Sequence, residues 1–121
     1  MPAFILVLTS AVGLVVGSPG AGPADAASPC TGRPARTIGF ATGELRVYRS
    51  RSYACVLAVA KKPGRRRQMS VQLQARGGAP VTDSGKYTKQ AGPVTVHALN
   101  RCVRAAGSIE GKTASTGWIL C

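Results

Sequence analysis

Four cysteines set the strongest limit on how this chain can fold. They are Cys30, Cys55, Cys102 and Cys121, separated by 25, 47 and 19 residues. No Cys-x-x-Cys pair is present and His97 is the only histidine, so the spacing does not indicate a zinc site. An even number of cysteines in a small exported domain predicts two disulfides. Three pairings are possible, and we favour Cys30–Cys55 with Cys102–Cys121, because each closes a short loop and ties down one terminus.

The N-terminal segment indicates export. Residues 4–16 (FILVLTSAVGLVV) form an apolar run that is shorter than the ~20 residues of an uninterrupted transmembrane helix. Ala24-Asp25-Ala26 fits the small-x-small pattern of signal peptidase cleavage. We therefore expect a signal peptide over residues 1–26, with cleavage after Ala27 as the alternative, and a single secreted β-domain over residues 27–121. No Lys or Arg precedes the apolar run, and an uncleaved membrane anchor is the competing interpretation.

The charge of the chain is strongly one-sided. All 16 Lys and Arg residues follow residue 30, against three acids, Glu44, Asp83 and Glu110, so the expected mature chain carries a net charge of +13. Such a charge attracts polyanions even without a specific site. Outside a cell these are anionic wall polymers, acidic lipids, polysaccharides and released nucleic acid. The competing explanation is that the charge only keeps the protein soluble.

Hydrophobic periodicity predicts strands after the leader and no amphipathic helix. The clearest half-buried strand lies within residues 68–76, where apolar residues alternate strictly with polar ones. Residues 53–60 (YACVLAVA) are apolar at nearly every position, which predicts a strand buried on both faces. Alternation also predicts strands at residues 43–49 and 94–99.

Turn residues then suggest how these strands connect. Pro63-Gly64 predicts a hairpin between residues 53–60 and 68–76, and Asp83-Ser84-Gly85 predicts a turn. Short strands separated by turns predict an all-β fold, a small antiparallel sandwich or barrel stapled by its disulfides. The expected core consists of Leu45, Val47, Val56, Leu57, Val59, Val71, Leu73, Val94, Val96, Val103, Ile109 and Trp118.

The predicted turn at residues 61–67 (KKPGRRR) is the strongest candidate for a binding site. Arg binds phosphate or carboxylate with a planar fork, and Lys binds them as a point charge, so this turn is a candidate polyanion site. We expect it to be extended by Arg46, Arg49, Arg51, Arg101 and Arg104 if the sheets bring them near. The candidate polyanion-binding residues of the turn are Lys61, Lys62, Arg65, Arg66 and Arg67.

Catalytic patterns are weak, and we expect a protein that is not an enzyme and uses no cofactor. The three acids are widely spaced, whereas paired-carboxylate catalysis needs two at one site. No Gly-x-Ser-x-Gly elbow and no phosphate-binding glycine loop is present. His97 falls on the polar side of a predicted strand, which indicates a surface histidine. Few aromatic residues are available for base stacking, so we expect no specific nucleic-acid partner.

Two other functions remain open on the sequence. A secreted protease inhibitor would present a Lys or Arg of an exposed loop to a trypsin-like pocket, but the turn lies six residues after Cys55 and is not bracketed by a disulfide. A membrane-perturbing role needs an amphipathic face beside the charge, and none is visible. We expect no integral membrane span in the mature chain.

Short motifs across most of the mature chain form a recognisable set. They are Leu45-Arg46-Val47-Tyr48, Tyr53-Ala54-Cys55-Val56, Gly85 with Tyr87, Ala91-Gly92-Pro93-Val94, Cys102-Val103, Gly107 and Cys121. In these motifs the chain resembles the spore-associated protein A family of actinomycetes. The resemblance implies export and association with a spore or cell surface, and it implies no catalytic site. Two features depart from the family pattern: Arg104-Ala105-Ala106 stands where members tend to have an aromatic residue, and the 61–67 turn is unusually basic.

Overall fold

Between residues 30 and 121, the part of the chain described by this computed structural model, all regular structure is β-strand. The prediction of an all-β fold is thus confirmed, and the expected signal peptide at residues 1–26 lies outside the described residues. The strands are β2 (Arg36–Phe40), β3 (Gly43–Arg49), β4 (Tyr53–Ala60), β5 (Arg67–Ala75), β6 (Val81–Tyr87), β7 (Gln90–His97), β8 (Val103–Ile109) and β9 (Lys112–Ser115).

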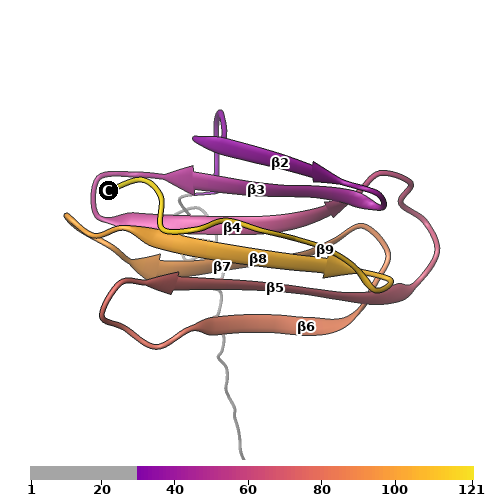
Figure 1. Ribbon diagram of the computed structural model, residues 1–121. Coiled ribbons are helices and arrows are strands. Elements are labelled where there is room, and N and C mark those ends of the chain that lie inside the picture. The colour runs from indigo at the N-terminus through magenta and orange to yellow at the C-terminus, as the bar shows by residue number, and fades with distance from the viewer. Residues whose placement is uncertain (1–29) are drawn as a thin grey trace, which may run out of the picture.

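The strands form two antiparallel sheets packed as a sandwich (Figure 1). The first sheet has the order β2-β3-β4-β7 and the second the order β6-β5-β8-β9. The sheets are aligned, so that β2 lies near β9 and β7 lies near β5 and β6. The chain crosses between the sheets after β4, after β6 and after β7, and both β4–β7 and β5–β8 are long-range pairs.

The predicted hairpin between residues 53–60 and 68–76 is wrong. Those segments are β4 and β5, which belong to different sheets. Loop 61–66 spans the gap of ~10 Å that separates packed sheets, and Gly64 N–H donates to Thr88 O at 2.9 Å to hold it against the next crossing. A Pro-Gly pair indicates that the chain changes direction. Such a change occurs in a hairpin and also where the chain crosses from one sheet to the other.

The core lies between the sheets and follows the predicted alternation. On β4, Ala54, Val56, Ala58 and Ala60 face inward and are buried, and small alanines let the sheets approach closely. Of the twelve expected core residues, Val59, Val96 and Trp118 are only half-buried. The prediction for Trp118 is wrong, because its ring lies against two arginines and outside the core. The expected core residues that are buried are Leu45, Val47, Val56, Leu57, Val71, Leu73, Val94, Val103 and Ile109.

A second apolar cluster lies on the outside of the first sheet. Tyr48, Cys55 and Leu57 are buried there, with Cys30 and Val59 packed against them. The Cys30–Cys55 disulfide pins the entering chain across this face. Residues 53–60 are therefore buried on both sides for most of their length, as the sequence predicts.

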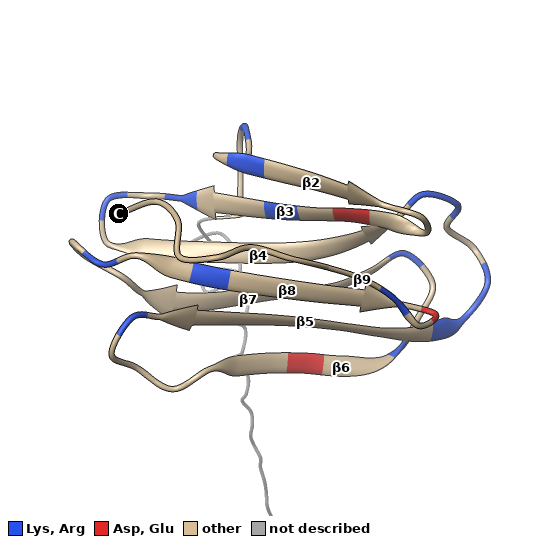
Figure 2. Cartoon of the chain, in the orientation of Figure 1, with Lys and Arg blue, Asp and Glu red and all other residues tan. Residues whose placement is uncertain are grey.

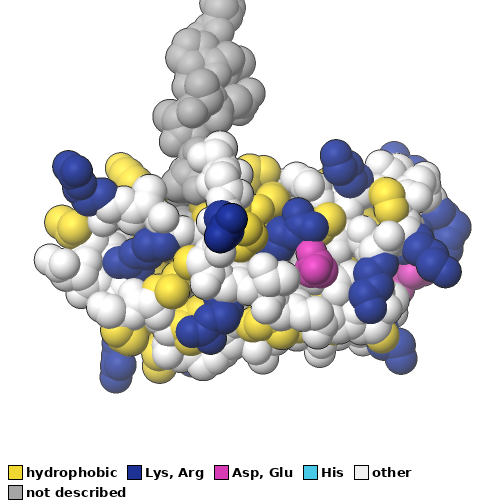
Figure 3. Space-filling view, turned by 90° about the horizontal axis from the view of Figure 1, so that it is seen from above, with side chains coloured by type: hydrophobic (Ala, Val, Ile, Leu, Met, Phe, Trp, Pro, Cys, Tyr) yellow, Lys and Arg dark blue, Asp and Glu magenta, His cyan; other side chains and the backbone are white. Residues whose placement is uncertain are grey.

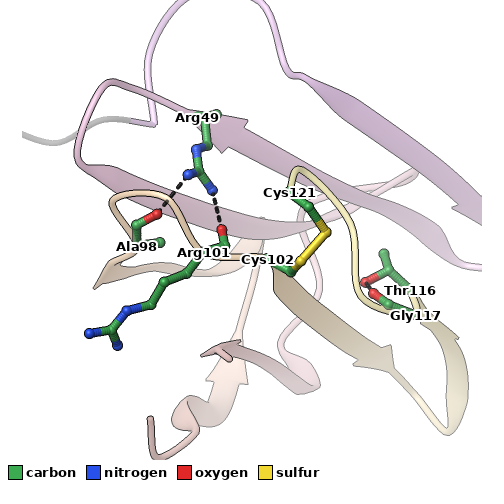
Figure 4. The surroundings of a disulfide bond; sticks show 7 residues. All are labelled: Arg49, Ala98, Arg101, Cys102, Thr116, Gly117 and Cys121. Atoms are coloured by element: carbon green, nitrogen blue, oxygen red, sulfur yellow. Dashed lines mark hydrogen bonds between the residues drawn. A yellow bond between two sulfur atoms is a disulfide. The ribbon is translucent and has the colours of Figure 1, made fainter. Parts of the chain in front are cut away.

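The second disulfide, Cys102–Cys121, closes the end of the sandwich where β3 ends and β8 begins, and the favoured pairing is confirmed. Next to it, Arg49 of β3 donates hydrogen bonds to Ala98 O at 2.6 Å and to Arg101 O at 3.0 Å (Figure 4). Arg49 thus ties the first sheet to the crossing between β7 and β8. Its guanidinium is engaged in holding the fold together.

The predicted turn at Asp83-Ser84-Gly85 is also wrong, because these residues lie inside β6 and pair with β5. Within β6, both oxygens of the Asp83 carboxylate are used in hydrogen bonds. It accepts hydrogen bonds from Tyr87 Oη at 2.6 Å and from Gly92 N–H at 2.8 Å. The hydrogen bond to Asp83 raises the pKa of Tyr87, because it favours the protonated phenol.

Candidate functional site

Four chain connections meet at one end of the sandwich, which we call the basic end. They are turn 41–42, loop 61–66, turn 88–89 and turn 110–111. Figure 2 shows Lys and Arg gathered there, on the right. The residues of the basic end are the five candidates Lys61, Lys62, Arg65, Arg66 and Arg67, together with Lys86, Lys89 and Lys112 from β6, the β6–β7 turn and β9.

The arginines expected to extend the site do not do so. Arg49 and Arg51 lie at the far end of β3 and in the turn after it, and Arg101 and Arg104 lie near the start of β8. Arg46 lies in the middle of β3, opposite Leu57. The three lysines take their place because antiparallel neighbours bring residues far apart in sequence to the same end of a sheet, which a linear pattern does not reveal.

Arg67, the last of the five candidates, supports the loop from inside. Its side chain is only 9% exposed. It donates hydrogen bonds to Lys62 O at 2.7 Å and to Arg65 O at 3.3 Å, and it lies 3.6 Å from Glu110 Oε1. Arg67 therefore fixes the shape of the loop and is not free to bind a partner.

Glu110 is the counter-ion of this loop. Its Oε2 lies 2.8 Å from Arg65, whose side chain is 69% exposed. Glu110 has a φ of 52° and Gly111 a φ of 81°, as a two-residue type I′ turn between β8 and β9 requires. A non-glycine residue in this region is uncommon, so the turn holds the carboxylate at a defined place beneath the loop.

Lys61, Lys62 and Arg66 remain as the exposed cations of the loop. None of them makes an ion pair or a side-chain hydrogen bond with another residue of the described chain. A shallow hollow of about 370 Å³ opens beside them, lined by Ala41, Thr42, Lys61, Lys62, Arg65, Arg67 and Glu110.

The space-filling view from above gives the same distribution of charge (Figure 3). Lys and Arg side chains crowd the right-hand end, and the acidic side chains visible on this face each lie against a basic one. Elsewhere on the first sheet, Arg46 pairs with Glu44 at 2.7 Å, and the hydrogen bond to Glu44 raises the pKa of Arg46. The basic end therefore has an excess of positive charge that Glu110, and Glu44 near the start of β3, only partly offset.

The residues considered for catalysis, His97 and Asp83, lie on strands of different sheets, β7 and β6. His97 is exposed and meets the ring of Tyr53 edge-on at 5.2 Å. Asp83 has both carboxylate oxygens occupied, by Tyr87 and by Gly92. Among residues 30–121, no group of three or more His, Cys, Asp or Glu side chains is placed to hold a metal ion.

In the part of the chain that the structure describes, no helix is long and apolar enough to cross a membrane. The two disulfides are compatible with an extracellular location, since such bonds persist in oxidising compartments. No family model, curated protein or solved structure matches this chain.

Proposed function

We propose that this protein is exported and binds anionic polymers of a spore or cell surface through the basic end, without catalysis. The observation that carries the proposal is that the charged residues of loop 61–67 have two different roles. Arg67 and Glu110 hold the loop from inside, while Lys61, Lys62 and Arg66 stand exposed around it. Because the loop is already ordered, binding a partner does not carry the entropy cost of fixing these side chains in place.

The chemistry of the partner follows from this arrangement. Three unpaired cations beside an open hollow suit a linear chain of phosphates or carboxylates better than one buried ion. Lys86, Lys89 and Lys112 continue the positive surface around the same end. Anionic wall polymers have this repeating charge, and the resemblance to the spore-associated protein A family would place such a protein at the spore or cell surface.

The test is sedimentation of the purified, oxidised protein with isolated cell walls and spores over a series of salt concentrations. One variant carries Lys61→Gln, Lys62→Gln and Arg66→Gln. A control variant with the same net charge carries Arg33→Gln, Arg36→Gln and Arg51→Gln, which are exposed, lie away from the basic end and make no side-chain contacts with described residues.

The proposal predicts that wild type binds at low salt and is released as salt rises, because contacts to a polyanion displace its counterions. The loop variant should bind at least tenfold more weakly, and the control should bind like wild type. Equal weakening of both variants would mean that net charge alone decides. Binding that ignores salt and both variants would reject the proposal.

Inhibition of a trypsin-like protease is the second candidate, favoured by one observation. Arg67 braces the backbone at Lys62 and Arg65, so the exposed Arg65–Arg66 segment sits on a loop held by hydrogen bonds in place of a flanking disulfide. Competitive inhibition of trypsin without cleavage between residues 65 and 67 would support it. Rapid cleavage there would reject it.

A further inference from the structure

The middle of the outer face of the second sheet is polar and uncharged. Strand register places its outward side chains in rows across β6, β5, β8 and β9. In a chain with 16 Lys and Arg, the two central rows contain none. We call these rows the polar face: Thr82, Gln72, Ala106 and Ser115 form one row, and Ser84, Ser70, Ser108 and Thr113 form the next.

The polar face is hollowed on the side of β8 and β9. Ala106 lies between Gln72 and Ser115, and its short side chain leaves a gap between longer neighbours. The hollow measures about 350 Å³, within the range of small-molecule sites. It is lined by Gln72, Gln74, Pro80, Arg104, Ala105, Ala106, Ser115 and Thr116.

A fixed guanidinium forms the border of this hollow. Arg104 Nε donates to Gln74 Oε1 at 3.0 Å, and the Arg104 guanidinium carbon lies 4.7 Å from the centre of the Trp118 ring. Gln74 is itself held, because its amide donates to Gly78 O at 2.8 Å. Arg104 is thus oriented by a hydrogen bond and by a cation–π contact, and its two terminal nitrogens make no hydrogen bond with a described residue.

The positive charge at this border has no counter-ion among the described residues. Arg76 also lies over Trp118, at 5.4 Å, so two guanidinium groups gather on one ring. Each of the three described acids is engaged elsewhere: Glu44 by Arg46, Asp83 by Tyr87 and Gly92, and Glu110 by Arg65 and Arg67. Two clustered cations without an acid favour an anionic group from outside the chain.

We propose that this hollow binds an acidic saccharide, with the carboxylate on Arg104 and the sugar ring over Ala106. The planar Arg fork matches a carboxylate. Amides and hydroxyls both donate and accept hydrogen bonds, so Gln72 and Ser115 match sugar hydroxyls that do the same. The short apolar floor of Ala106 and Pro80 matches the C–H face of a sugar ring.

This site lies on a sheet face, away from loop 61–67, so it does not depend on the proposed function of the basic end. The basic end is expected to bind many polyanions, whereas the hollow requires one acid group together with a polyhydroxylated ring. Failure of either proposal therefore leaves the other standing.

Trp118 provides a direct readout, since it is the only tryptophan of the chain. The probes are trigalacturonic acid, its uncharged methyl ester and inorganic phosphate. Each is titrated into the oxidised protein while tryptophan fluorescence is recorded, and calorimetry measures the same binding independently. Arg104→Gln removes the guanidinium. Ala106→Leu fills the hollow and leaves the charge unchanged. Arg101→Gln removes an exposed arginine whose side chain makes no hydrogen bond or ion pair with the described residues.

The expected result is saturable binding of trigalacturonic acid, at least tenfold weaker for the methyl ester and for phosphate. Arg104→Gln and Ala106→Leu should each lose at least tenfold in affinity, and Arg101→Gln should behave like wild type. Equal binding of phosphate, an unaffected Ala106→Leu variant, or no saturable binding would each overturn the proposal.

Discussion

Arg66 and Arg67 are identical neighbours in the sequence and have opposite roles in the structure. Arg66 is exposed and without an ion pair in the described chain, whereas Arg67 is nearly buried and binds two carbonyls and Glu110. Composition and spacing treat the five residues of the loop alike. Only the packing of turn 110–111 against the loop separates those that build the site from those that face a partner.

Arg67→Gln is expected to lower the free energy of unfolding by about 1–3 kcal/mol, because it leaves two loop carbonyls without their donor and weakens the pairing of Glu110. Arg66→Gln, which removes the same charge, should change it by less than about 0.5 kcal/mol. Urea unfolding of both variants measures the difference. Equal midpoints would show that Arg67 does not brace the loop.

The raised pKa of Tyr87 predicts that the free energy of unfolding decreases at alkaline pH. Its pKa is raised above 10.0 by the hydrogen bond to Asp83, so the folded state favours the protonated phenol. This contribution is complete below the unfolded pKa near 10 and is lost as pH rises through the raised folded pKa. Tyrosinate absorbance should show a late-titrating component that is lost in Tyr87→Phe. A late component that persists in Tyr87→Phe would assign it to another residue.

At the scale of strands, the sequence predicts what each segment is better than where it pairs. Alternation in residues 68–76 and the apolar run at 53–60 identify β5 and β4 correctly, but each of these strands also pairs with a strand distant in sequence, β4 with β7 and β5 with β8. The polar segment at Asp83 is a strand because it pairs with β5, and the Asp83 carboxylate accepts hydrogen bonds from Tyr87 and Gly92. The Asp-Ser-Gly pattern, which is typical of a turn, indicates neither feature. Strands β2 and β9 were not predicted, since their few apolar side chains are only half-buried at the sheet edges.

Gly43 tests how closely the two sheets approach at the start of β3. A methyl group there would overlap Val59 O and lie 2.7 Å from Ile109 Cδ1. Gly43→Ala should therefore destabilise the protein by about 1–3 kcal/mol, as overpacking does. Gly39→Ala, in the neighbouring β2, meets no atom within 4 Å and serves as the control. Thermal unfolding that ranks the two variants equally would contradict this packing.

At the scale of the molecule, the fold separates two kinds of surface. The basic end collects eight Lys and Arg residues from five segments of chain, and the outer face of the second sheet keeps its central rows uncharged. The total charge was evident from the sequence, whereas this separation depends on topology. The two disulfides stabilise the parts of the domain away from the basic end. One pins the entering chain to β4, and the other closes the end opposite the basic end.

Removal of the second disulfide should loosen that opposite end. Cys102→Ala with Cys121→Ala is expected to lower the free energy of unfolding by about 3 kcal/mol, the usual value for a loop of this length. Polyanion binding by loop 61–67 should persist under native conditions, because the loop lies at the far end. Loss of that binding in a folded variant would show that the two ends are coupled.

The most direct test of the account is the salt dependence of binding to a defined polymer, poly(glycerol phosphate). The slope of log affinity against log salt concentration reports the number of ionic contacts, at roughly one per contacting cation. The account predicts that the variant with Lys61, Lys62 and Arg66 changed to Gln has a slope about three smaller in magnitude. The control lacking Arg33, Arg36 and Arg51 should keep the wild-type slope. Equal slopes for both variants would contradict the claim that the basic end is the contact.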